Sequence, residues 1–555
     1  MSSIFRTRYY YDMPNTRTIF AFIILLAIFF RFWHMPDTPP GLYPDEAMNG
    51  TNALQALESG NFRAYYIDNN GREGLFINLQ ALAIWFLGNE AWVLRFVSAL
   101  FGTLAVLGIY FLTKELFWKN SRKETIALLT SFFLASSYWH LTLSRIGFRT
   151  ITTPTFSILA FYFLFRGMRR NSMFDFALSG IMLGLGLNGY IAFRFIPFAF
   201  AVPILIGLWR WWKGQANNTE EGAFPSRFSS PTTPTPPSEN REGKAPQTCF
   251  PCAVVLIGIF VITVCTPLIL YFTEHPEDFA TRTGQVSVFA DEHPLRAFVI
   301  SNVKIVSMLT VFGDCNPRHN FPCFPALHPI VAIAFLYGLF AMIKKGDRLA
   351  QATLIAWLLF MTLPATLTRE GMPHALRSIG MIPPVMIIAG FGAYVLWEKL
   401  RIMLNKKLAF QVALLLLAVI PLTTGYLYFG IWAKTPSTAS AFSQDLSELA
   451  IYVRSLSPDT MKYLIVELDY EGLPVSAQSV VYLTNTATPQ SQKERNVVYL
   501  PRLNTTRRIE LGEKPAIIGF VAFHDNALEQ EIERAFPSLI KEKRSGFTVY
   551  IYNPY

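Results

Sequence analysis

Long apolar runs recur along the whole chain, and each is close to the ~20 residues that a helix needs to cross the hydrocarbon of a bilayer. Of the 555 residues, 52% are hydrophobic and only 15% are charged, whereas about a quarter of a soluble globular chain is charged. This composition excludes a soluble cytosolic enzyme and a disordered protein, and five cysteines are too few for a disulfide framework. The chain is therefore predicted to be a polytopic α-helical membrane protein.

Eleven of these runs are expected to be transmembrane helices. They cover residues 18–33, 92–113, 125–143, 152–165, 176–193, 195–209, 252–272, 328–343, 350–367, 381–397 and 408–431. The first run lacks a small-residue cleavage site and continues through Arg31, so no cleavable signal peptide is expected.

Lysine and arginine residues gather in every second connection between these runs. The positive-inside rule makes those connections cytoplasmic. It also accounts for the net charge of +10 without a nucleic-acid partner. We therefore expect a multi-pass protein of the plasma (inner) membrane, with its N-terminus in the cytoplasm and its C-terminus in the extracytoplasmic space.

The chain divides into two predicted domains. Residues 1–433 form a transmembrane domain with two long outer connections, 34–91 and 273–327, and connections of this length usually have a function. Residues 214–248 are rich in Pro, Ser and Thr and are expected to be a disordered cytoplasmic linker. Residues 437–555 alternate strand-like and helix-like segments, which predicts a small extracytoplasmic α/β domain.

Arginine dominates the outer side of this predicted topology. Between residues 18 and 433 that side has a single lysine, Lys304, and the following arginines: Arg31, Arg63, Arg72, Arg95, Arg145, Arg149, Arg194, Arg282, Arg296, Arg318, Arg369 and Arg377. A guanidinium group binds phosphate oxygens bidentately and keeps its charge. The group as a whole favours anion binding, although lipid headgroups or neighbouring acids account equally well for any one arginine.

An amphipathic helix is predicted at the start of the first outer connection. Pro44 is suited to a first helical turn, and Asp45, Glu46, Asn49 and Asn52 follow at spacings of three and four. Acids at a helix start are commonly dipole partners only. Beside an arginine set suited to phosphate, however, such a carboxylate can act as a general base or a metal ligand.

This region resembles glycosyltransferase family 39 and its relatives, the membrane transferases similar to protein O-mannosyltransferases and to the lipid A aminoarabinose transferase. The likeness is carried by the acidic pair Asp45 and Glu46, by Arg72–Gly74 at the place of a lysine-proline-proline-like element, and by Arg95 at the start of the second span. Similar segments follow in order at 144–156, 188–198, 275–289, 313–322 and 369–384.

The resemblance implies a C-type glycosyltransferase fold and a sugar transfer from a polyprenyl-phosphate donor to an acceptor at the outer face of the lipid bilayer. The acceptor is a protein, a glycolipid or a cell-envelope glycan. By motif position Asp45 is the expected base, with Glu46 as the alternative. The expected donor-phosphate ligands are Arg72, Arg145, Arg149 and Arg377, and the other expected substrate contacts are Asn49, Glu73, Tyr190, Arg194, Arg318 and His374.

No cofactor is implied with certainty. A divalent metal ion bound by Glu46 and His319 is one reading, although no HExxH or CxxC-type metal spacing supports it. Cys315 and Cys323 are expected to form a disulfide if their compartment is oxidising. Cys249 and Cys252 are expected to pack at the start of a span.

Two other classes of function compete with this interpretation. A multi-pass transporter or flippase of a lipid-linked or anionic substrate predicts ionisable residues at mid-membrane, broken helices and an internal repeat, and none is clear in the sequence. A sensor or assembly factor leaves the arginine set unexplained. A surface-polysaccharide polymerase or ligase is a variant within the enzyme class, and the acidic pair argues against it.

Overall fold

The computed structural model describes residues 15–221, 249–279, 292–345, 347–368, 371–467 and 473–554. The predicted linker begins at residue 214, but helix α9 (Ile196–Glu221) continues through the first eight of its residues. The remainder of the linker lies outside the described residues, as do Arg282 and Arg369.

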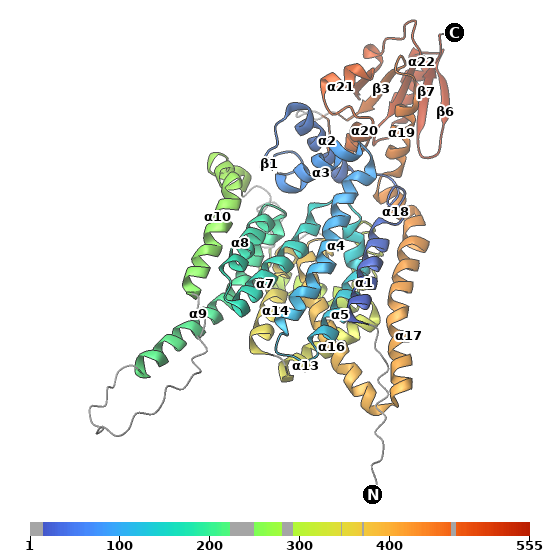
Figure 1. Ribbon diagram of the computed structural model, residues 1–555. Helices are drawn as coiled ribbons and strands as arrows, with labels where there is room; N and C mark the ends of the chain where they lie inside the picture. The colour runs from blue at the N-terminus through green and yellow to red at the C-terminus, as the bar shows by residue number, and fades with distance from the viewer. Residues whose placement is uncertain are drawn as a thin grey trace, which may run out of the picture.

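A bundle of long helices forms the larger part of the molecule (Figure 1). The bundle contains α1 (Thr16–Phe32), α4 (Ala91–Leu116), α5 (Lys123–Ala135), α6 (Tyr138–Ser144), α7 (Thr152–Arg170), α8 (Met173–Leu187), α9, α10 (Phe250–Glu274), α13 (Pro329–Lys345), α14 (Arg348–Phe360), α15 (Leu363–Thr366), α16 (Ile382–Met403) and α17 (Lys406–Gly425). Shorter turns adjoin them: η1 (Arg149–Ile151), η2 (Ile191–Phe195), η4 (Ile379–Met381), η5 (Tyr426–Ile431) and η6 (Trp432–Lys434).

Each of the eleven apolar runs is largely helical, but their lengths differ. Six helices in the described part of the chain are long and apolar enough to cross a membrane, or seven if one bent pair counts as a span. The six are Ala91–Leu116, Ile191–Lys213, Phe250–Glu274, Arg348–Thr366, Ile379–Met403 and Lys406–Lys434.

The bent pair is the third predicted run, which the structure breaks into α5 and α6 at an angle of 58°. The break falls at two serines. Ser137 caps α6, because its side chain accepts a hydrogen bond from the backbone amide of His140. The carbonyl of Ser136 accepts a hydrogen bond from the Thr424 hydroxyl at 2.8 Å. Side-chain hydroxyls thus bind backbone groups that the helix no longer pairs.

Two helices of the first long connection lie across one end of the bundle (Figure 1). Helix α2 (Pro44–Ser59) starts with a proline, a residue that is favoured in the first turn of a helix. It is followed by Gly60, whose φ of 70° is the left-handed conformation that commonly ends a helix. A short antiparallel pair, β1 (Tyr65–Tyr66) and β2 (Arg72–Glu73), leads into α3 (Gly74–Leu87). The predicted amphipathic helix is therefore present, and α3 follows it.

The second long connection contains α12 (Pro294–Thr310) and a loop closed by a disulfide between Cys315 and Cys323. Cys249 and Cys252 also form a disulfide, at the start of α10. The sequence interpretation of that second pair as simple packing is therefore corrected. In both cases the short separation and the shared turn bring the two sulfur atoms together.

A mixed five-stranded sheet follows the bundle near the C-terminus, in the order β4-β3-β5-β7-β6. Its strands are β3 (Met461–Val466), β4 (Val497–Pro501), β5 (Ala516–Phe520), β6 (Ile540–Lys543) and β7 (Thr548–Tyr552). The helices and turns around it are α18 (Pro436–Ala441), α19 (Gln444–Ser455), η7 (Val475–Ala477), α20 (Gln478–Leu483), α21 (Pro489–Glu494), η8 (Thr506–Arg508) and α22 (Asn526–Ala535). Strands and helices therefore alternate in this region, as its sequence pattern predicts.

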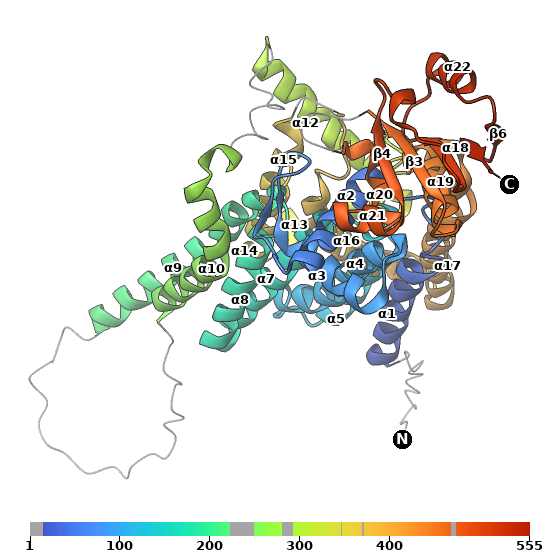
Figure 2. The same ribbon diagram turned by 90° about the horizontal axis from the view of Figure 1, so that it is seen from above.

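The sheet region packs onto α2 and α3, as the two ribbon views show (Figures 1 and 2). One apolar cluster includes Leu54 of α2, Ile77 of α3, Leu94 of α4, Leu449 of α19 and Tyr482 of α20. A larger cluster forms the interior of the helix bundle. The shared cluster fixes α2 beneath the sheet and so positions the first turn of α2, where the acidic pair lies.

Candidate active site

A polar cavity of about 380 Å³ lies beside the first turn of α2. It is lined by Tyr43, Asp45, Asn49, Asn69, Arg72, Phe148, Arg149, Thr150, Tyr190, Asn316, Arg318, His319, His374, Leu376 and Arg377. Six separate stretches of the chain therefore meet here. Nine of the residues that the sequence singled out are among them.

Asp45 is the carboxylate that lines this cavity. It lies in the first turn of α2, half-buried, and Asn69 donates a hydrogen bond to its Oδ1 at 2.9 Å. Tyr43 precedes it, and burial followed by the negative charge of Asp45 raises the pKa of the Tyr43 phenol. The phenol therefore stays protonated and available as a hydrogen-bond donor at neutral pH.

Glu46 points away from the cavity, although it is adjacent to Asp45. Its side chain is fully buried, and its Oε2 accepts hydrogen bonds from Arg95 Nε at 3.0 Å and from the Gly147 amide at 3.1 Å. Arg95 also donates to the carbonyls of Pro39 and Gly41. These contacts give Glu46 a structural role in place of the base or metal-ligand role expected from the sequence.

Arg72 is held by hydrogen bonds to α2. Its two terminal nitrogens donate to Asn49 Oδ1 and Asn52 Oδ1, each at 2.5 Å, and its Nε donates to the Asp68 carbonyl at 3.2 Å. The spacing of Asn49 and Asn52 places both amides on one face of the helix. The predicted polar face of α2 thus orients a guanidinium at the cavity wall.

Arg149 reaches the cavity from η1. Its Nε donates to Glu73 Oε2 at 3.1 Å, and its guanidinium lies over the Tyr190 ring, 5.5 Å from the centroid. Arg194 approaches the other oxygen of Glu73 at 3.8 Å. Glu73 and Arg194 are not among the residues that line the cavity. Glu73 contacts the cavity residue Arg149 directly, and Arg194 contacts Glu73.

Two further arginines of the cavity lining come from the segments 316–319 and 374–377. Arg318 stacks over the Tyr43 ring at 4.2 Å, and its Nε donates to Asn316 Oδ1 at 3.3 Å. Arg377 donates to the Thr368 hydroxyl at 2.7 Å. With Arg72 and Arg149, they make four guanidinium groups around a cavity whose described lining contains one carboxylate, Asp45.

Arg145 does not join this group. It is fully buried, and its terminal nitrogens donate to the carbonyls of Phe30, Arg31 and Thr38 at 2.8 to 3.0 Å. Its guanidinium also lies near the Tyr428 ring. It therefore ties the end of α1 to the bundle, and this structural role replaces the phosphate-binding role expected from the sequence.

Two histidines line the cavity and stack on each other. The rings of His319 and His374 are 4.7 Å apart at 22°. His319 Nδ1 lies 3.2 Å from Asp314 Oδ2. Burial, followed by the charges of His319, Arg377 and Arg318, lowers the pKa of His374 well below its usual range. His374 is therefore neutral at neutral pH.

The sequence did not single out several residues of this site. Asp314 lies within the family-like segment 313–322, so a carboxylate five positions before His319 was the available signal. Asn69 lies just before Arg72 and carries no such signal. Its role depends on the turn that brings it back to Asp45.

Such a cavity can bind an anion and move a proton. Guanidinium groups stabilise the negative charge of a phosphate, and a half-buried carboxylate can accept a proton from a hydroxyl. In the described lining the positive groups outnumber the negative one. The arrangement therefore suits a substrate that carries a phosphate and reacts at a neighbouring carbon–oxygen bond.

Comparisons with known proteins find a family match in part of the chain and a similar fold among solved structures. Residues 75–218 match the family model described as dolichyl-phosphate-mannose-protein mannosyltransferase. Among solved structures, the fold is similar to that of ArnT from Cupriavidus metallidurans, bound to undecaprenyl phosphate (TM-score 0.56, 13% identity, covering 96% of this chain and 97% of ArnT). For the same protein in the apo state the TM-score is 0.55, the identity 13%, and the coverage 97% and 98%. No curated protein sequence matches the chain.

Proposed function

We propose that this chain is a membrane glycosyltransferase of the protein O-mannosyltransferase and ArnT kind, with a specific reaction. The chain transfers a sugar from a polyprenyl-phosphate donor to a hydroxyl acceptor on the extracytoplasmic face of the membrane. The observation that carries this proposal is the cavity in which one carboxylate, Asp45, faces four arginines.

The chemistry is a displacement at the anomeric carbon of the sugar. The acceptor oxygen forms a bond to that carbon, and the bond from the carbon to the phosphate oxygen breaks. The acceptor proton passes to Asp45, and the polyprenyl phosphate leaves with the bonding electrons. Asn69 holds the Asp45 carboxylate in place for this step.

The arginines stabilise the phosphate that departs. Arg72, Arg149 and Arg377 bind its oxygens, and Arg318 adds positive charge to the same cavity. Asn49 and Glu73 do not touch the phosphate in this account; they orient Arg72 and Arg149. Tyr190 stacks on Arg149 and completes that orientation. Fixed cations act most strongly on charge that develops as the bond breaks.

The membrane arrangement in this proposal is the one that the sequence favours. Eleven helices cross the plasma (inner) membrane, with the N-terminus in the cytoplasm and the cavity and C-terminal sheet outside. The distribution of lysine supports the orientation. The ArnT structure with bound undecaprenyl phosphate supports a polyprenyl-phosphate donor, since the two chains share a fold.

The acceptor is proposed to approach between α2 and the C-terminal sheet. A second cavity of about 690 Å³ lies there, lined by Pro44 next to Asp45 and by residues of the sheet region, including Asp445, Ser476 and His524. Hydroxyl, carboxylate and imidazole groups suit the hydroxyl-rich acceptors of this reaction, whether on a protein, a glycolipid or a cell-envelope glycan.

The proposal is tested in cells that lack the protein. Surface glycans and polyprenyl lipids are compared by mass spectrometry after rescue with the wild type, with Asp45→Asn, or with Asp37→Asn. Asp37 is an exposed acid of the same connection, so its variant is the matched control. We expect one glycan to be missing, with its lipid-linked sugar accumulating, in the null and Asp45→Asn cells only.

Full rescue by Asp45→Asn would contradict the proposal. A carboxamide cannot accept the proton, so normal glycans in those cells would mean that Asp45 is structural. A transporter of a lipid-linked or anionic substrate would then account better for the cavity.

A further inference from the structure

Asp314, His319 and His374 form a compact group beside the active-site cavity. Each offers one ligand atom, and the three atoms lie within 4.8 Å of one another. Asp314 Oδ2 is 3.2 Å from His319 Nδ1 and 4.0 Å from His374 Nδ1. Ligand atoms around a tetrahedral Zn²⁺ ion lie about 3.4 Å apart, since each is about 2.1 Å from the metal. The separation of 3.2 Å is close to this value and that of 4.0 Å is somewhat longer, so the three side chains are near the arrangement that a bound metal ion would require.

Hydrogen bonding alone explains only part of this group. The Asp314–His319 pair is a normal hydrogen bond at 3.2 Å, but 4.0 Å is too long for one between Asp314 and His374. His374 Nδ1 is buried and has no hydrogen-bond partner among the described residues. A buried nitrogen without a partner costs roughly 1–3 kcal/mol. A cation bound between the three side chains would give this nitrogen a partner.

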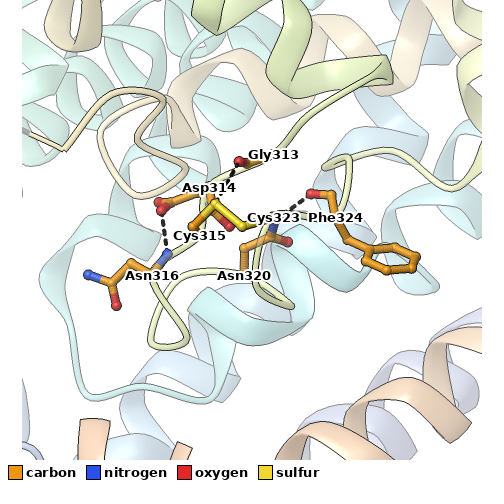
Figure 3. Close-up of a disulfide and its surroundings, with 7 residues drawn as sticks. All are labelled: Gly313, Asp314, Cys315, Asn316, Asn320, Cys323 and Phe324. Carbon is orange, nitrogen blue, oxygen red and sulfur yellow. Dashed lines mark hydrogen bonds between the residues drawn. A yellow bond between two sulfur atoms is a disulfide. The ribbon is translucent and has the colours of Figure 1, made fainter. Parts of the chain in front are cut away.

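The group is also held rigidly before any ligand binds. Asp314 Oδ1 accepts a hydrogen bond from the backbone amide of Asn316 at 2.8 Å, and the disulfide between Cys315 and Cys323 closes the loop (Figure 3). Asn320 donates to the Asp314 carbonyl at 3.2 Å and to the Phe324 carbonyl.

One hydrogen bond joins this loop to the one that carries His374. The Ala375 amide donates to Asp314 Oδ2 at 2.9 Å, and the Ala375 carbonyl accepts from Trp139 Nε1 at 2.9 Å. The three ligands therefore come from two loops that are fixed against each other, as a preorganised metal site requires.

We propose that Asp314, His319 and His374 bind one divalent transition-metal ion at the wall of the cavity. Two imidazole nitrogens and one carboxylate suit Zn²⁺ and its first-row neighbours, whereas Mg²⁺ and Ca²⁺ prefer oxygen ligands only. His319 and His374 both line the cavity, so an ion between them borders the substrate.

The role of the ion, though not its binding, rests on the proposed function. Next to Arg318 and Arg377 it adds positive charge where a donor phosphate would bind. This ligand set replaces the pairing of Glu46 with His319 considered from the sequence, because the Glu46 carboxylate is bound to Arg95.

The test measures zinc bound to the purified full-length protein. The protein in detergent is stripped with a chelator, incubated with ZnCl₂, desalted and analysed by elemental mass spectrometry. We expect about one tightly bound zinc per chain in the wild type. His374→Ala should fall to background, and His34→Ala should match the wild type. His34 is an exposed histidine 3.5 Å from the carboxylate of Asp37, so its variant controls for nonspecific zinc binding at surface histidines.

A second measurement guards against misfolding. Asp314 binds two backbone amides, so His374→Ala, which removes none of these bonds, is the deciding variant. Its folding is checked by size-exclusion chromatography, and zinc should raise the melting temperature of the wild type but not of this variant. Wild-type protein without stoichiometric zinc, or His374→Ala with as much as the wild type, would overturn the proposal.

The two proposals fail in different ways. Stoichiometric zinc without any glycosyl transfer leaves the metal site standing and removes the proposed reaction. Full transfer by protein that binds no zinc leaves the reaction standing and removes the metal site.

Discussion

Four arginines near the cavity fall into two groups according to the atoms that their guanidinium groups contact. Arg95 and Arg145 are fully buried and donate to backbone carbonyls or to Glu46, which fixes loops around the end of α1. Arg72 and Arg149 line the cavity and are aimed by polar side chains. Arginine thus lines the cavity at two positions and holds the surrounding loops in place at two others.

Replacing Arg72 by lysine should weaken donor binding. Lysine keeps the charge but cannot donate to Asn49, Asn52 and a phosphate in the geometry of a guanidinium fork. Loss of one charged hydrogen bond, worth roughly 1.5–3 kcal/mol, corresponds to about a 10- to 100-fold higher KM for the donor. Initial rates against donor concentration measure this. Arg63→Lys, at an exposed position of the same connection, should keep the wild-type KM.

Removing the carboxylate of Glu46 should destabilise the fold. Glu46→Ala leaves Arg95 buried without its acid, and breaking a buried pair in this way costs about 3–5 kcal/mol. Thermal unfolding in detergent should show a clearly lower melting temperature. Glu58→Ala, at an exposed position of α2, is the control, and equal melting of the two variants would contradict the structural role of Glu46.

Residue types and motif position predicted much of the site, but not the direction of each side chain. Asp45 and Glu46 are adjacent in the sequence and equally acidic. Only the helix rotation in the folded chain separates them, one lining the cavity and the other buried against Arg95. Similarly, nothing in the sequence distinguishes Arg145 from Arg149, whose partners come from distant elements.

Among the elements, the loop that carries Asp314 and His319 depends most on a covalent bond. The disulfide joins residues eight positions apart. In the chain-entropy treatment, closing so small a loop contributes about 2–3 kcal/mol.

The double variant Cys315→Ser/Cys323→Ser should therefore melt at a lower temperature and transfer sugar more slowly. Thermal unfolding and initial transfer rates measure the two effects. Cys249→Ser/Cys252→Ser removes the other disulfide, whose residues do not line the cavity, and should retain the wild-type transfer rate. Equal rates for both double variants would show that the loop needs no such closure.

Helices were the most predictable elements, because apolar runs of membrane length have few alternatives. Their interruptions were not predictable. The break between α5 and α6 combines the local cap at Ser137 with a hydrogen bond from Thr424 of a distant helix, and the sequence does not reveal that second contact. The pairing of Cys249 with Cys252 likewise depended on the turn at the start of α10.

At the scale of the whole molecule, the sheet region and the bundle share one apolar cluster. Tyr482 of α20 is buried within it, packs against Gly50 of α2, and donates a hydrogen bond to the Glu90 carbonyl at 3.3 Å. The composition change near residue 433 predicted a separate unit. It could not predict this junction, since the junction depends on tertiary packing between segments about 400 positions apart.

Tyr482→Ala should consequently destabilise the protein by about 3–5 kcal/mol, as truncation of large buried aromatic side chains does. It should also lower the transfer rate, because α2 carries Asp45. Thermal unfolding and a transfer assay report the two effects. Leu503→Ala, at a 78% exposed position of the sheet region, should change neither, and wild-type melting of Tyr482→Ala would mean that the sheet docks without this contact.

The most direct test of the central claim is transfer by purified protein in lipid nanodiscs. Lipid-linked sugar from cells lacking the protein serves as donor, acceptor-bearing membranes from the same cells supply the acceptor, and release of free polyprenyl phosphate is the readout. We predict release by the wild type and by Asp37→Asn, and a rate lower by about 10²- to 10⁴-fold for Asp45→Asn. Equal release by wild type and Asp45→Asn would contradict the assignment of Asp45 as the base, and no release by the wild type would contradict the proposed transfer itself.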